Sequence, residues 1–261
     1  MDNFVPLDSL EKEGYARIIC YPKVNTEEFG KKVAEMRHLG VEALRFEGSK
    51  KIGNIHVLGK GYVGIVVLTK TVSGLAALKI KRTDSGRFGM QHEAEVLRKV
   101  NVVGVGPKLL GFSENLLLME FVDGTPFPLW VQDLAETEDA RLVARRVLNE
   151  ILEQCWRLDE VGVDHGELSN APKHIIVCVD GGVCILDFES ASDQRRVSNV
   201  TSVCHYLFLK GSIAETVRRK VVDVNSVSLL EALRAYKKDR TLNNFKIVLK
   251  VCLLRKNDVF Q

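Results

Sequence analysis

The sequence lacks the features that would place it in a membrane or in an oxidising compartment. No stretch approaches the about 20 consecutive apolar residues of a transmembrane helix. The N-terminus, Met-Asp-Asn-Phe-Val-Pro, has neither the basic nor the apolar region of a secretory signal. The six cysteines form no Cys-x-x-Cys pair and mostly lie inside apolar runs, which favours buried free thiols over a disulfide or a zinc site. We therefore expect a cytoplasmic protein that does not contact a membrane.

Internal repeats and low-complexity tracts are also absent, and the composition is that of a globular chain. Its 261 residues are 46% hydrophobic, enough for one bilobal unit or two small domains. Residues 191–261 hold 14 Lys and Arg against 6 Asp and Glu, a net charge of +8, whereas residues 1–190 hold 23 against 28, a net charge of −5. This basic C-terminal third could contact RNA or an acidic partner, but its charges are scattered, which favours solvated helix faces.

Residues 1–50 predict a small strand–helix–strand appendage. The first strand is expected at Tyr15–Cys20, an apolar segment followed by Tyr21-Pro22. Asn25 can cap a helix whose apolar residues follow helical spacing as far as Gly40. The second strand is expected at residues 41–46.

Residues 51–123 predict a β-rich lobe, and residues 124–261 a helical lobe. In the first lobe we expect a helix at residues 87–100 and strands at residues 52–58, 65–70, 75–80, 108–112 and 116–121. Asp123-Gly124-Thr-Pro predicts a turn at the boundary.

The clearest helix is expected in the second lobe at residues 137–160. Thr137 is a good N-cap, and one broad apolar face is formed by Leu142, Val147, Ile151, Leu152, Cys155 and Leu158. A β-hairpin is expected at residues 175–179 and 183–186, and further helices near residue 200 and at residues 226–236.

A glycine-rich loop, Gly59-x-Gly61-x-x-Gly64, has the spacing used by dinucleotide-binding folds and by kinases. A dinucleotide-binding fold needs a helix directly after the loop. Here the β-branched run Ile65–Leu68 follows, so the loop joins strand to strand, as in kinases, where backbone amides lie over the phosphates. An ordinary glycine-rich hairpin is the alternative.

Lys79 lies in an apolar strand, Leu75-Ala-Ala-Leu-Lys-Ile, where a charged amine needs a partner. In a kinase it reaches the α- and β-phosphates and is held by a glutamate of the next helix. Glu93 and Glu95 lie about 200° apart on that helix, so one of them faces the lysine. Ala94 and Leu97 flank Glu93, which favours it. The alternative is a lysine on the solvent face of its strand.

Two carboxylates flank the expected hairpin of the second lobe. Glu167 lies in the preceding loop, His165-Gly166-Glu167-Leu168-Ser169, and Asp187 directly follows the second strand. Phosphoryl transfer needs one carboxylate that positions the acceptor hydroxyl and another that binds magnesium. The alternatives are a solvated loop acid at Glu167 and a turn residue at Asp187.

Four segments in a fixed order carry a resemblance to a known family. His92–Leu97 is similar to a pattern Arg-Glu-Ala-x-Leu-Leu, and Met119–Gly124 is similar to a hinge that binds adenine through its backbone. His165–Leu168 is similar to His-Gly-Asp-Leu, and Ile185–Glu189 to Ile-Asp-Phe-Gly. Over about residues 52–210 the chain resembles the small atypical branch of the eukaryotic-like kinases. That branch holds the RIO-type kinases and the kinase of the tRNA-modifying KEOPS complex, and the chain is most similar to predicted archaeal Ser/Thr kinases with an Asp-His-Gly-Glu-Leu-Ser signature.

The resemblance implies a bilobal kinase-like fold that binds ATP with Mg²⁺ or Mn²⁺. It assigns Lys79, Glu167 and Asp187 to catalysis and Asp187 to the metal. The residues that it places against the nucleotide are Gly59, Lys60, Gly61, Gly64, Val66, Ala77, Lys79, Glu93, Glu120 and Val122.

The catalytic loop departs from the family pattern in its carboxylate and in its second metal ligand. Glu167 replaces an Asp, so its carboxylate reaches one methylene further. The Asn expected five residues later is Pro172, and counting back thirteen residues from Asp187 reaches His174. Asn170 is the single asparagine of this loop. Mg²⁺ prefers oxygen ligands to histidine, so Mn²⁺, a single metal or a metal held mainly by Asp187 would fit.

Two further departures concern the segment after Asp187. Glu189 stands where the family has Gly, and no Ala-Pro-Glu follows, so a long activation segment and a peptide-docking subdomain are not expected.

Three functions remain open from the sequence. The first is an ATP-dependent atypical Ser/Thr kinase or autophosphorylating ATPase acting on a protein or ribonucleoprotein. The second is a small-molecule phosphotransferase of the aminoglycoside or sugar kinase type, which Glu189 favours. The third is an ATP-binding pseudokinase scaffold, which Glu167 and His174 favour.

Overall fold

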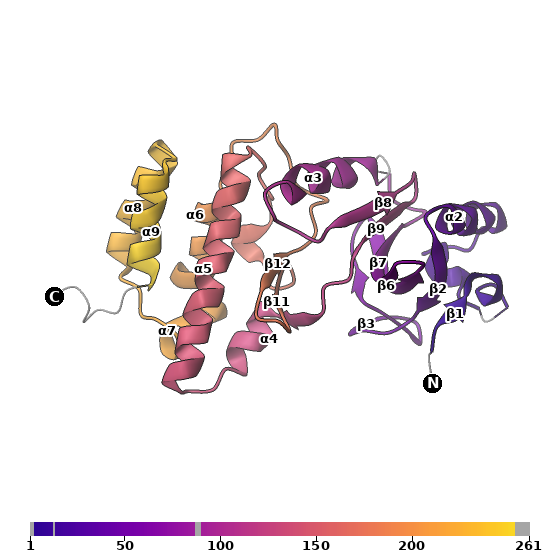
Figure 1. Cartoon of the computed structure of the whole chain (residues 1–261), viewed down its shortest axis with the longest axis horizontal. Helices are drawn as coiled ribbons and strands as arrows, with labels where there is room; N and C mark the ends of the chain where they lie inside the picture. Colours follow the sequence, from indigo (N-terminus) through magenta and orange to yellow (C-terminus); the bar gives the residue numbers. More distant parts are fainter. Residues whose placement is uncertain (1–2, 13, 87–89, 254–261) are drawn as a thin grey trace. The chain divides into compact units, whose positions relative to one another are not determined.

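The computed structural model describes residues 3–12, 14–86 and 90–253, and the chain divides into two units. Unit 1 comprises residues 1–101 and 107–122, and unit 2 comprises residues 102–106 and 123–261. Helices and antiparallel strands occur in both units (Figure 1). The expected α+β class is therefore confirmed.

Unit 1 is built on an antiparallel sheet of seven described strands. The order is β1-β2-β6-β7-β9-β8, with β5 paired to β6. The strands are β1 (Val5–Pro6), β2 (Val41–Arg45), β5 (Gly59–Lys60), β6 (Gly64–Thr71), β7 (Gly74–Lys81), β8 (Leu109–Phe112) and β9 (Leu116–Glu120). The expected strands at residues 65–70, 75–80, 108–112 and 116–121 are confirmed.

The strands alternate between two faces of this sheet. Ile65 and Val67 of β6 are at most 1% exposed and pack in one core with Met36 of helix α2 (Thr26–His38). Val66 points to the opposite face and is half-buried. The Asn25 side chain accepts a hydrogen bond from the Glu28 N–H at 3.0 Å, so the expected N-cap of α2 is confirmed.

The first strand expected in the appendage is wrong. Residues Ala16–Ile19 form the short helix α1, and β1 supplies the strand instead. Ile18 and Ile19 are both fully buried, which one helical turn allows, whereas a strand would point them to opposite faces. Strand β1 pairs with β2 and β2 with β6, so both strands of this segment belong to the main sheet of unit 1.

The prediction of a single strand at residues 52–58 is also wrong, because a turn divides this segment into two short strands. Gly53 and Asn54 form a two-residue turn between β3 (Lys50–Ile52) and β4 (Ile55–Val57), which pair with Ile52 opposite Ile55. After β9 the expected turn at Asp123–Pro126 is a strand, β10 (Gly124–Pro126) of unit 2. A Cβ at Gly124 would lie 2.3 Å from the Val177 carbonyl oxygen, so glycine permits this close strand pairing.

Helix α3 (Gln91–Asn101) completes unit 1. Its expected start at Arg87 lies outside the described residues.

Unit 2 combines the small sheet β10-β11-β12 with a set of helices. Strands β11 (Ile175–Cys178) and β12 (Val183–Ile185) form the expected hairpin. The helical elements are α4 (Phe127–Gln132), α5 (Glu138–Glu160), η2 (Leu168–Asn170), α6 (Asn199–Cys204), the π-helical η3 (His205–Leu209), α7 (Ser212–Lys220), α8 (Ser226–Lys238) and α9 (Leu242–Leu253). Helix α9 packs against α5, and α8 packs against α9 (Figure 1).

Helix α5 is the central element of unit 2, and its expected position is confirmed. The Thr137 hydroxyl accepts a hydrogen bond from the Ala140 N–H at 3.3 Å. Val147, Ile151 and Leu158 are buried, but Leu142, expected on the same face, is 47% exposed because the buried face begins at Ala144. The expected helices near residue 200 and at residues 226–236 are confirmed, whereas α4, α7 and α9 were not anticipated.

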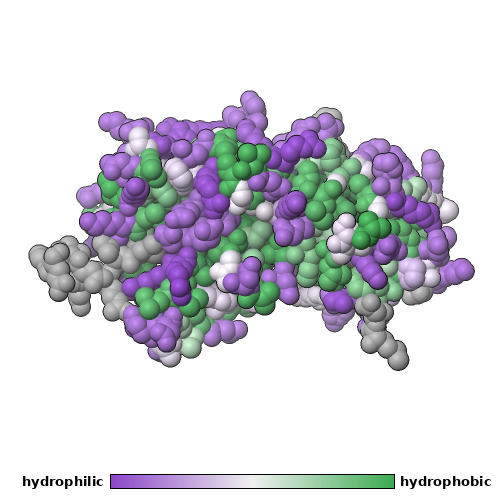
Figure 2. Space-filling view, viewed as in Figure 1, coloured by the Kyte–Doolittle hydropathy of each residue, from purple (hydrophilic) through white to green (hydrophobic). Residues whose placement is uncertain are grey.

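The burial of the cysteines and the hydropathy of the surface are those of a globular chain, as the composition predicts. Five of the six cysteines are buried and Cys178 is half-buried, in keeping with their place in apolar runs. Hydrophilic side chains cover much of the face in Figure 2, with smaller hydrophobic patches among them. In the part of the chain that the structure describes, no helix is both long and apolar enough to cross a bilayer.

Replacing Glu35 with alanine is expected to destabilise unit 1. Its carboxylate accepts hydrogen bonds from the Asn115 N–H at 3.0 Å, from the Asn115 side chain at 2.7 Å and from the Ser113 hydroxyl, so it ties α2 to the turn between β8 and β9. Losing a charged acceptor of buried Asn115 should cost about 2 kcal/mol of unfolding free energy, measured by urea denaturation.

The matched control is Lys31→Ala on the same helix. Lys31 forms an exposed ion pair with Glu114, which should contribute little. Equal unfolding midpoints for the two variants would contradict the assigned role of Glu35.

Candidate functional site

The glycine-rich loop of unit 1 is a hairpin between β5 and β6. Gly59 pairs with Val66 and Lys60 with Ile65, and the Gly61 N–H donates to the Gly64 carbonyl at 2.8 Å. The loop therefore joins strand to strand, which confirms that part of the sequence interpretation. A helix N-terminus, which a dinucleotide-binding loop needs, does not follow it.

Gly64 allows the hairpin to lie directly against Lys79. A Cβ at this position would lie 2.9 Å from Lys79 Cγ and 3.0 Å from the Ile80 carbonyl oxygen. Any side chain at residue 64 would therefore displace either the lysine or the backbone of β7. The hairpin and the lysine form one packed assembly.

Lys79 and Glu93 form a buried ion pair. Lys79 Nζ lies 2.8 Å from Glu93 Oε2, and the two side chains are 5% and 6% exposed. Glu95 instead accepts a hydrogen bond from the Gln91 side chain on the exposed side of α3. The prediction that Glu93 faces Lys79 is confirmed, and the alternative of a solvent-facing Lys79 is wrong.

The sheet places other predicted nucleotide residues beside this ion pair. Val66 is paired directly with Lys79, and Ala77 lies two residues before it, so all three side chains share one face of the sheet. Glu120 ends β9, and its carboxylate accepts the Lys108 N–H at 3.2 Å. Val122, two residues later, is half-buried.

Lys60 lies apart from this group. Its ammonium is 4.6 Å from the centre of the Tyr21 ring, a cation–π contact. The guanidinium of Arg82 lies 5.0 Å from the same ring.

In unit 2, the buried His165 fixes the backbone of the Glu167 loop. It is fully buried; its Nε2 lies 3.0 Å from the Leu186 carbonyl oxygen, and its Nδ1 accepts the Glu167 N–H at 3.4 Å. These contacts assign the neutral tautomer with hydrogen on Nε2. Burial lowers the pKa of His165, against the opposing effect of its bond to Leu186.

Glu167, His174 and Asp187 come together beside this histidine. His174 is 1% exposed; its Nε2 lies 3.0 Å from a Glu167 carboxylate oxygen, and its Nδ1 lies 3.7 Å from an Asp187 oxygen. Neither ring nitrogen has hydrogen-bond geometry with a partner in the described structure. The histidine is thus a buried polar group placed between two carboxylates that remain partly exposed.

The charge state of Glu167 follows from its partners. A side-chain hydrogen bond with Ser190 lowers the pKa of Glu167, opposed by partial burial and assisted by His174. Glu167 is therefore ionised near neutral pH and can accept a proton or orient a hydroxyl.

Asp187 has the one positive φ among the described non-glycine residues, +70°. This left-handed conformation is unfavourable for most side chains, although Asp tolerates it better than others. Residues held in such conformations cluster at functional sites, which singles out Asp187 at the end of the hairpin.

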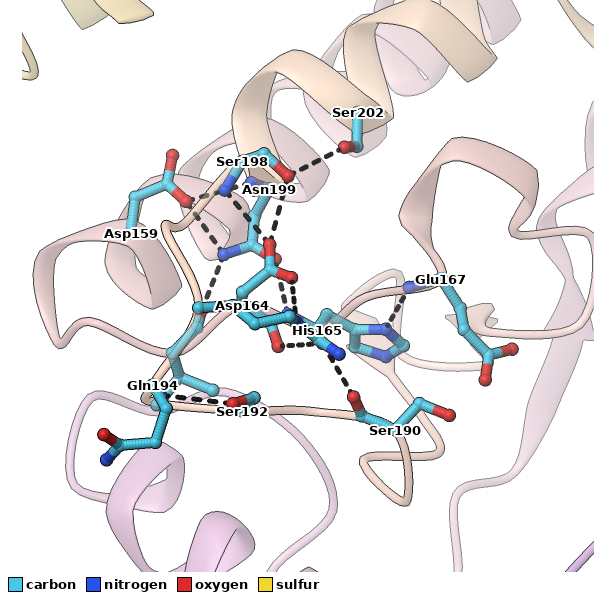
Figure 3. Close-up of polar contacts among 12 residues, drawn as sticks. Asp159, Asp164, His165, Glu167, Ser190, Ser192, Gln194, Ser198, Asn199 and Ser202 are labelled. Carbon is cyan, nitrogen blue, oxygen red and sulfur yellow. Dashed lines mark hydrogen bonds and ion pairs between the residues drawn. The ribbon is translucent and has the colours of Figure 1, made fainter.

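A buried polar network supports the loop from behind (Figure 3). The Asn199 side chain donates to Asp159 at 2.8 Å and to the Val163 carbonyl at 2.7 Å, and accepts the His165 N–H at 2.9 Å. Asp159 also accepts from the Tyr236 hydroxyl at 2.9 Å. Burial raises the pKa of Asp159, against the opposing effect of these hydrogen bonds.

A second support is centred on Asp164, the residue before His165. Its carboxylate accepts the Arg195 Nε–H at 3.0 Å and both the N–H and the hydroxyl of Ser198 at 3.1 Å (Figure 3). Its backbone pairs with Ser192 through two hydrogen bonds of 2.9 Å. Sequence reasoning missed these supporting residues, although Asp164 stands within the Asp-His-Gly-Glu signature and a polar residue next to a functional motif is a usable signal.

The carboxylates of this site fit a metal that is also held by phosphate. Mg²⁺ is commonly bound by one or two carboxylates together with substrate phosphates, and Asp187 offers a partly exposed oxygen donor. Of the two other predicted ligands, His174 lies beside Asp187, whereas Asn170 has an exposed side chain and donates its backbone N–H to the Glu167 carbonyl at 3.1 Å. Among the described residues, no three His, Cys, Asp or Glu side chains are arranged to enclose a metal by themselves.

Comparison with known proteins finds a similarity to an archaeal protein. The chain is 29% identical over 122 residues to the uncharacterized protein MJ1211 of the archaeon Methanocaldococcus jannaschii. The match covers 46% of this chain and 99% of MJ1211. No protein-family model matches the chain. The function must therefore be argued from the site.

From the lowered pKa of His165 we predict how the unfolding free energy depends on pH. The folded state holds the neutral ring, so the unfolded state binds more protons as pH falls below about 6.5. The contribution of His165 is full above this pH and is lost as pH falls towards the folded pKa. The unfolding free energy of the wild type should therefore exceed that of His165→Gln by less at pH 5.5 than at pH 7.5, measured by urea denaturation.

His38→Gln is the control, because His38 is exposed at the end of α2. It should follow the wild type at each pH. A gap between wild type and His165→Gln that stays constant from pH 7.5 to 5.5 would rule out a buried neutral His165.

Proposed function

We propose that this chain is an ATP-dependent phosphotransferase of the atypical Ser/Thr kinase type, acting on a protein or on itself. The observation that carries the proposal is the buried Lys79–Glu93 ion pair packed against the glycine hairpin. Burying two charges costs several kcal/mol per ion before their attraction is counted, and apolar residues of similar volume often do as well for stability. A pair kept there despite this cost is best explained by a function of the ammonium group.

Phosphate binding is that function. An ammonium held in place by Glu93 and a turn whose backbone N–H groups approach closely are the two elements that hold a nucleoside triphosphate in kinases. Val66 and Ala77 give an apolar surface next to Lys79 for the adenine ring, and the backbone of Glu120 and Val122 provides donors and acceptors for its edge.

Unit 2 supplies the groups for transfer. An acceptor hydroxyl oxygen attacks the γ-phosphorus, the bond to the β,γ-bridging oxygen breaks, ADP leaves, and the hydroxyl proton passes to Glu167. The lowered pKa of Glu167 keeps it ionised and ready to orient the hydroxyl. Asp187 would hold Mg²⁺ or Mn²⁺, which neutralises phosphate charge when bound.

One observation favours a second candidate, a nucleotide-binding scaffold without turnover. His174 lies 3.0 Å from the Glu167 carboxylate and fills the space between it and Asp187. If this contact persists with nucleotide bound, Glu167 cannot turn towards an acceptor. The two candidates share nucleotide binding and differ in transfer, so separate measurements distinguish them.

Nucleotide binding should depend on Glu93 and not on Glu95. Glu93→Gln leaves Lys79 buried without its counter-charge and should weaken ATP binding at least tenfold by isothermal titration calorimetry. Glu95→Gln, two residues along the same helix, should bind within about twofold of wild type, because the Glu95 carboxylate is exposed and accepts a hydrogen bond from the Gln91 side chain.

A double variant separates folding from binding. Lys79→Met with Glu93→Leu replaces the ion pair with apolar groups, which should retain the fold. ATP binding by this folded variant at wild-type affinity would overturn the phosphate-binding role of the pair.

Transfer is tested with γ-labelled ATP and Mg²⁺ or Mn²⁺. Glu167→Gln and Asp187→Asn should each lower the rate of protein labelling or phosphate release at least a hundredfold, while ATP still binds to Glu167→Gln. Asp180→Asn, in the hairpin turn, is the control and should match wild type.

Wild-type protein that binds ATP but yields no label and no free phosphate would favour the scaffold. Label transferred to small metabolites and not to protein would assign the chain to the small-molecule phosphotransferases, which Glu189 favours.

A further inference from the structure

Unit 2 contains a cavity whose wall is largely arginine. It has a volume of about 210 Å³ and lies between the N-terminal part of α5 and the C-terminal end of α7. It is lined by Arg141 and Arg145 of α5, Arg218 and Arg219 of α7, and Val221, Val222 and Asp223 after α7.

The positive charge of this cavity is only weakly compensated by direct ion pairs. Arg218 Nε lies 3.7 Å from Asp223, and an Arg141 nitrogen lies 3.8 Å from Glu138, both longer than the about 3.2 Å of a good hydrogen bond. The Nε–H of Arg145 is buried and has no hydrogen-bond partner within the described structure. A buried guanidinium donor without an acceptor is costly, and the residues around Arg145 do not satisfy this nitrogen.

The helix dipole explains why two of these arginines lie where they do, but it does not explain Arg141. Arg218 and Arg219 lie in the last turn of α7, where cations complement the helix dipole. Arg141 lies in the N-terminal part of α5, near the positive end of its dipole, where a cation is unfavourable. Four guanidinium groups that converge on one cavity also repel one another. A bound anion would relieve that repulsion.

We propose that this cavity binds a compact phosphate group, as free pyrophosphate or phosphate or as the phosphomonoester of a small molecule. The planar guanidinium fork matches phosphate oxygens with paired hydrogen bonds. The volume suits one or two phosphate groups. The two valines are the hydrophobic part of the lining, and none of the described residues that line the cavity is aromatic and able to stack on a nucleic-acid base. A chain of phosphodiesters is therefore a poorer match than a terminal phosphate.

This site does not depend on the phosphotransferase proposal, because none of its residues belongs to the Lys79 or Glu167 groups. It gives the basic C-terminal third a defined contribution, through Arg218 and Arg219, in place of a general surface charge.

The test is calorimetric titration of the full chain with inorganic pyrophosphate, inorganic phosphate and a phosphorylated sugar at physiological ionic strength. Arg145→Gln combined with Arg219→Gln should weaken pyrophosphate binding at least a hundredfold. Arg145→Lys, which keeps the charge and loses the fork, should weaken it about tenfold. Arg146→Gln, the next residue of α5, is exposed and outside the cavity and should bind as wild type does.

A second measurement uses the wild type alone, so it tests the proposal even if a variant does not fold. Arginine modification with phenylglyoxal, mapped by mass spectrometry, should be slowed by pyrophosphate at Arg141, Arg145, Arg218 and Arg219 and unchanged at Arg146. Stronger protection by pyrophosphate or phosphate than by the sugar phosphate identifies a free-anion site, and the reverse identifies a metabolite site; both support the proposal.

Three results would overturn it. The first is a wild type that does not bind any of the three probes, and the second is equal affinity in wild type and the Arg145→Gln, Arg219→Gln double variant. The third is tight binding of a single-stranded RNA oligonucleotide that pyrophosphate does not displace, with protection of the same arginines. That result would assign the cavity to a nucleic-acid surface.

Discussion

The Lys79–Glu93 ion pair is the constraint on which the functional arrangement of unit 1 depends. A charged lysine in the middle of β7 is tolerable only because Glu93 reaches it from α3 at 2.8 Å. The pair therefore fixes which face of α3 meets the sheet. It also excludes a side chain at residue 64, because the aliphatic part of Lys79 occupies the space where a Cβ would lie. Helix, strand and glycine hairpin are positioned by one interaction.

In unit 2, buried neutral groups hold the Glu167 loop in place, while the charged side chains of that loop are not fully buried. Asn199 joins Asp159, the Val163 carbonyl and the His165 N–H, so three stretches of chain are held by one amide. His165, kept neutral by burial, then holds the Glu167 N–H and the Leu186 carbonyl. The buried groups fix the backbone of the loop, and the side chains of Glu167 and Asp187 stay partly exposed.

Local signals in the sequence were sufficient for many of the elements. The caps at Asn25 and Thr137 mark α2 and α5 because each needs only a side chain and a nearby N–H. Strand β6 has a β-branched run that a helix would not favour. The choice of Glu93 over Glu95 followed from helical geometry together with the apolar neighbours Ala94 and Leu97, and Glu93 does face Lys79.

The predictions that were wrong concern features set by contacts between distant residues, or segments too short to show a hydrophobic periodicity. Residues 16–19 make one helical turn, whose apolar pattern is the same as that of a short strand. Gly124 lies in a strand only because Val177 is close by, and Leu142 is exposed because the buried face of α5 starts later. The Asn199 network joins residues such as His165 and Asn199, 34 positions apart, and the arginine cavity joins α5 to α7. Contacts over such separations produce no recognisable pattern in the local sequence.

The most direct test of the account is to ask which lysine meets the phosphates. ATP whose γ-phosphate carries a reactive acyl group acylates an amine that lies against the triphosphate and releases ATP. Peptide mass spectrometry of the wild-type chain should find Lys79 acylated, and excess ATP should block the reaction. Acylation of the exposed lysines Lys60 and Lys70 with Lys79 unmodified, to the same extent with and without ATP, would contradict the assignment of Lys79 as the phosphate-binding residue.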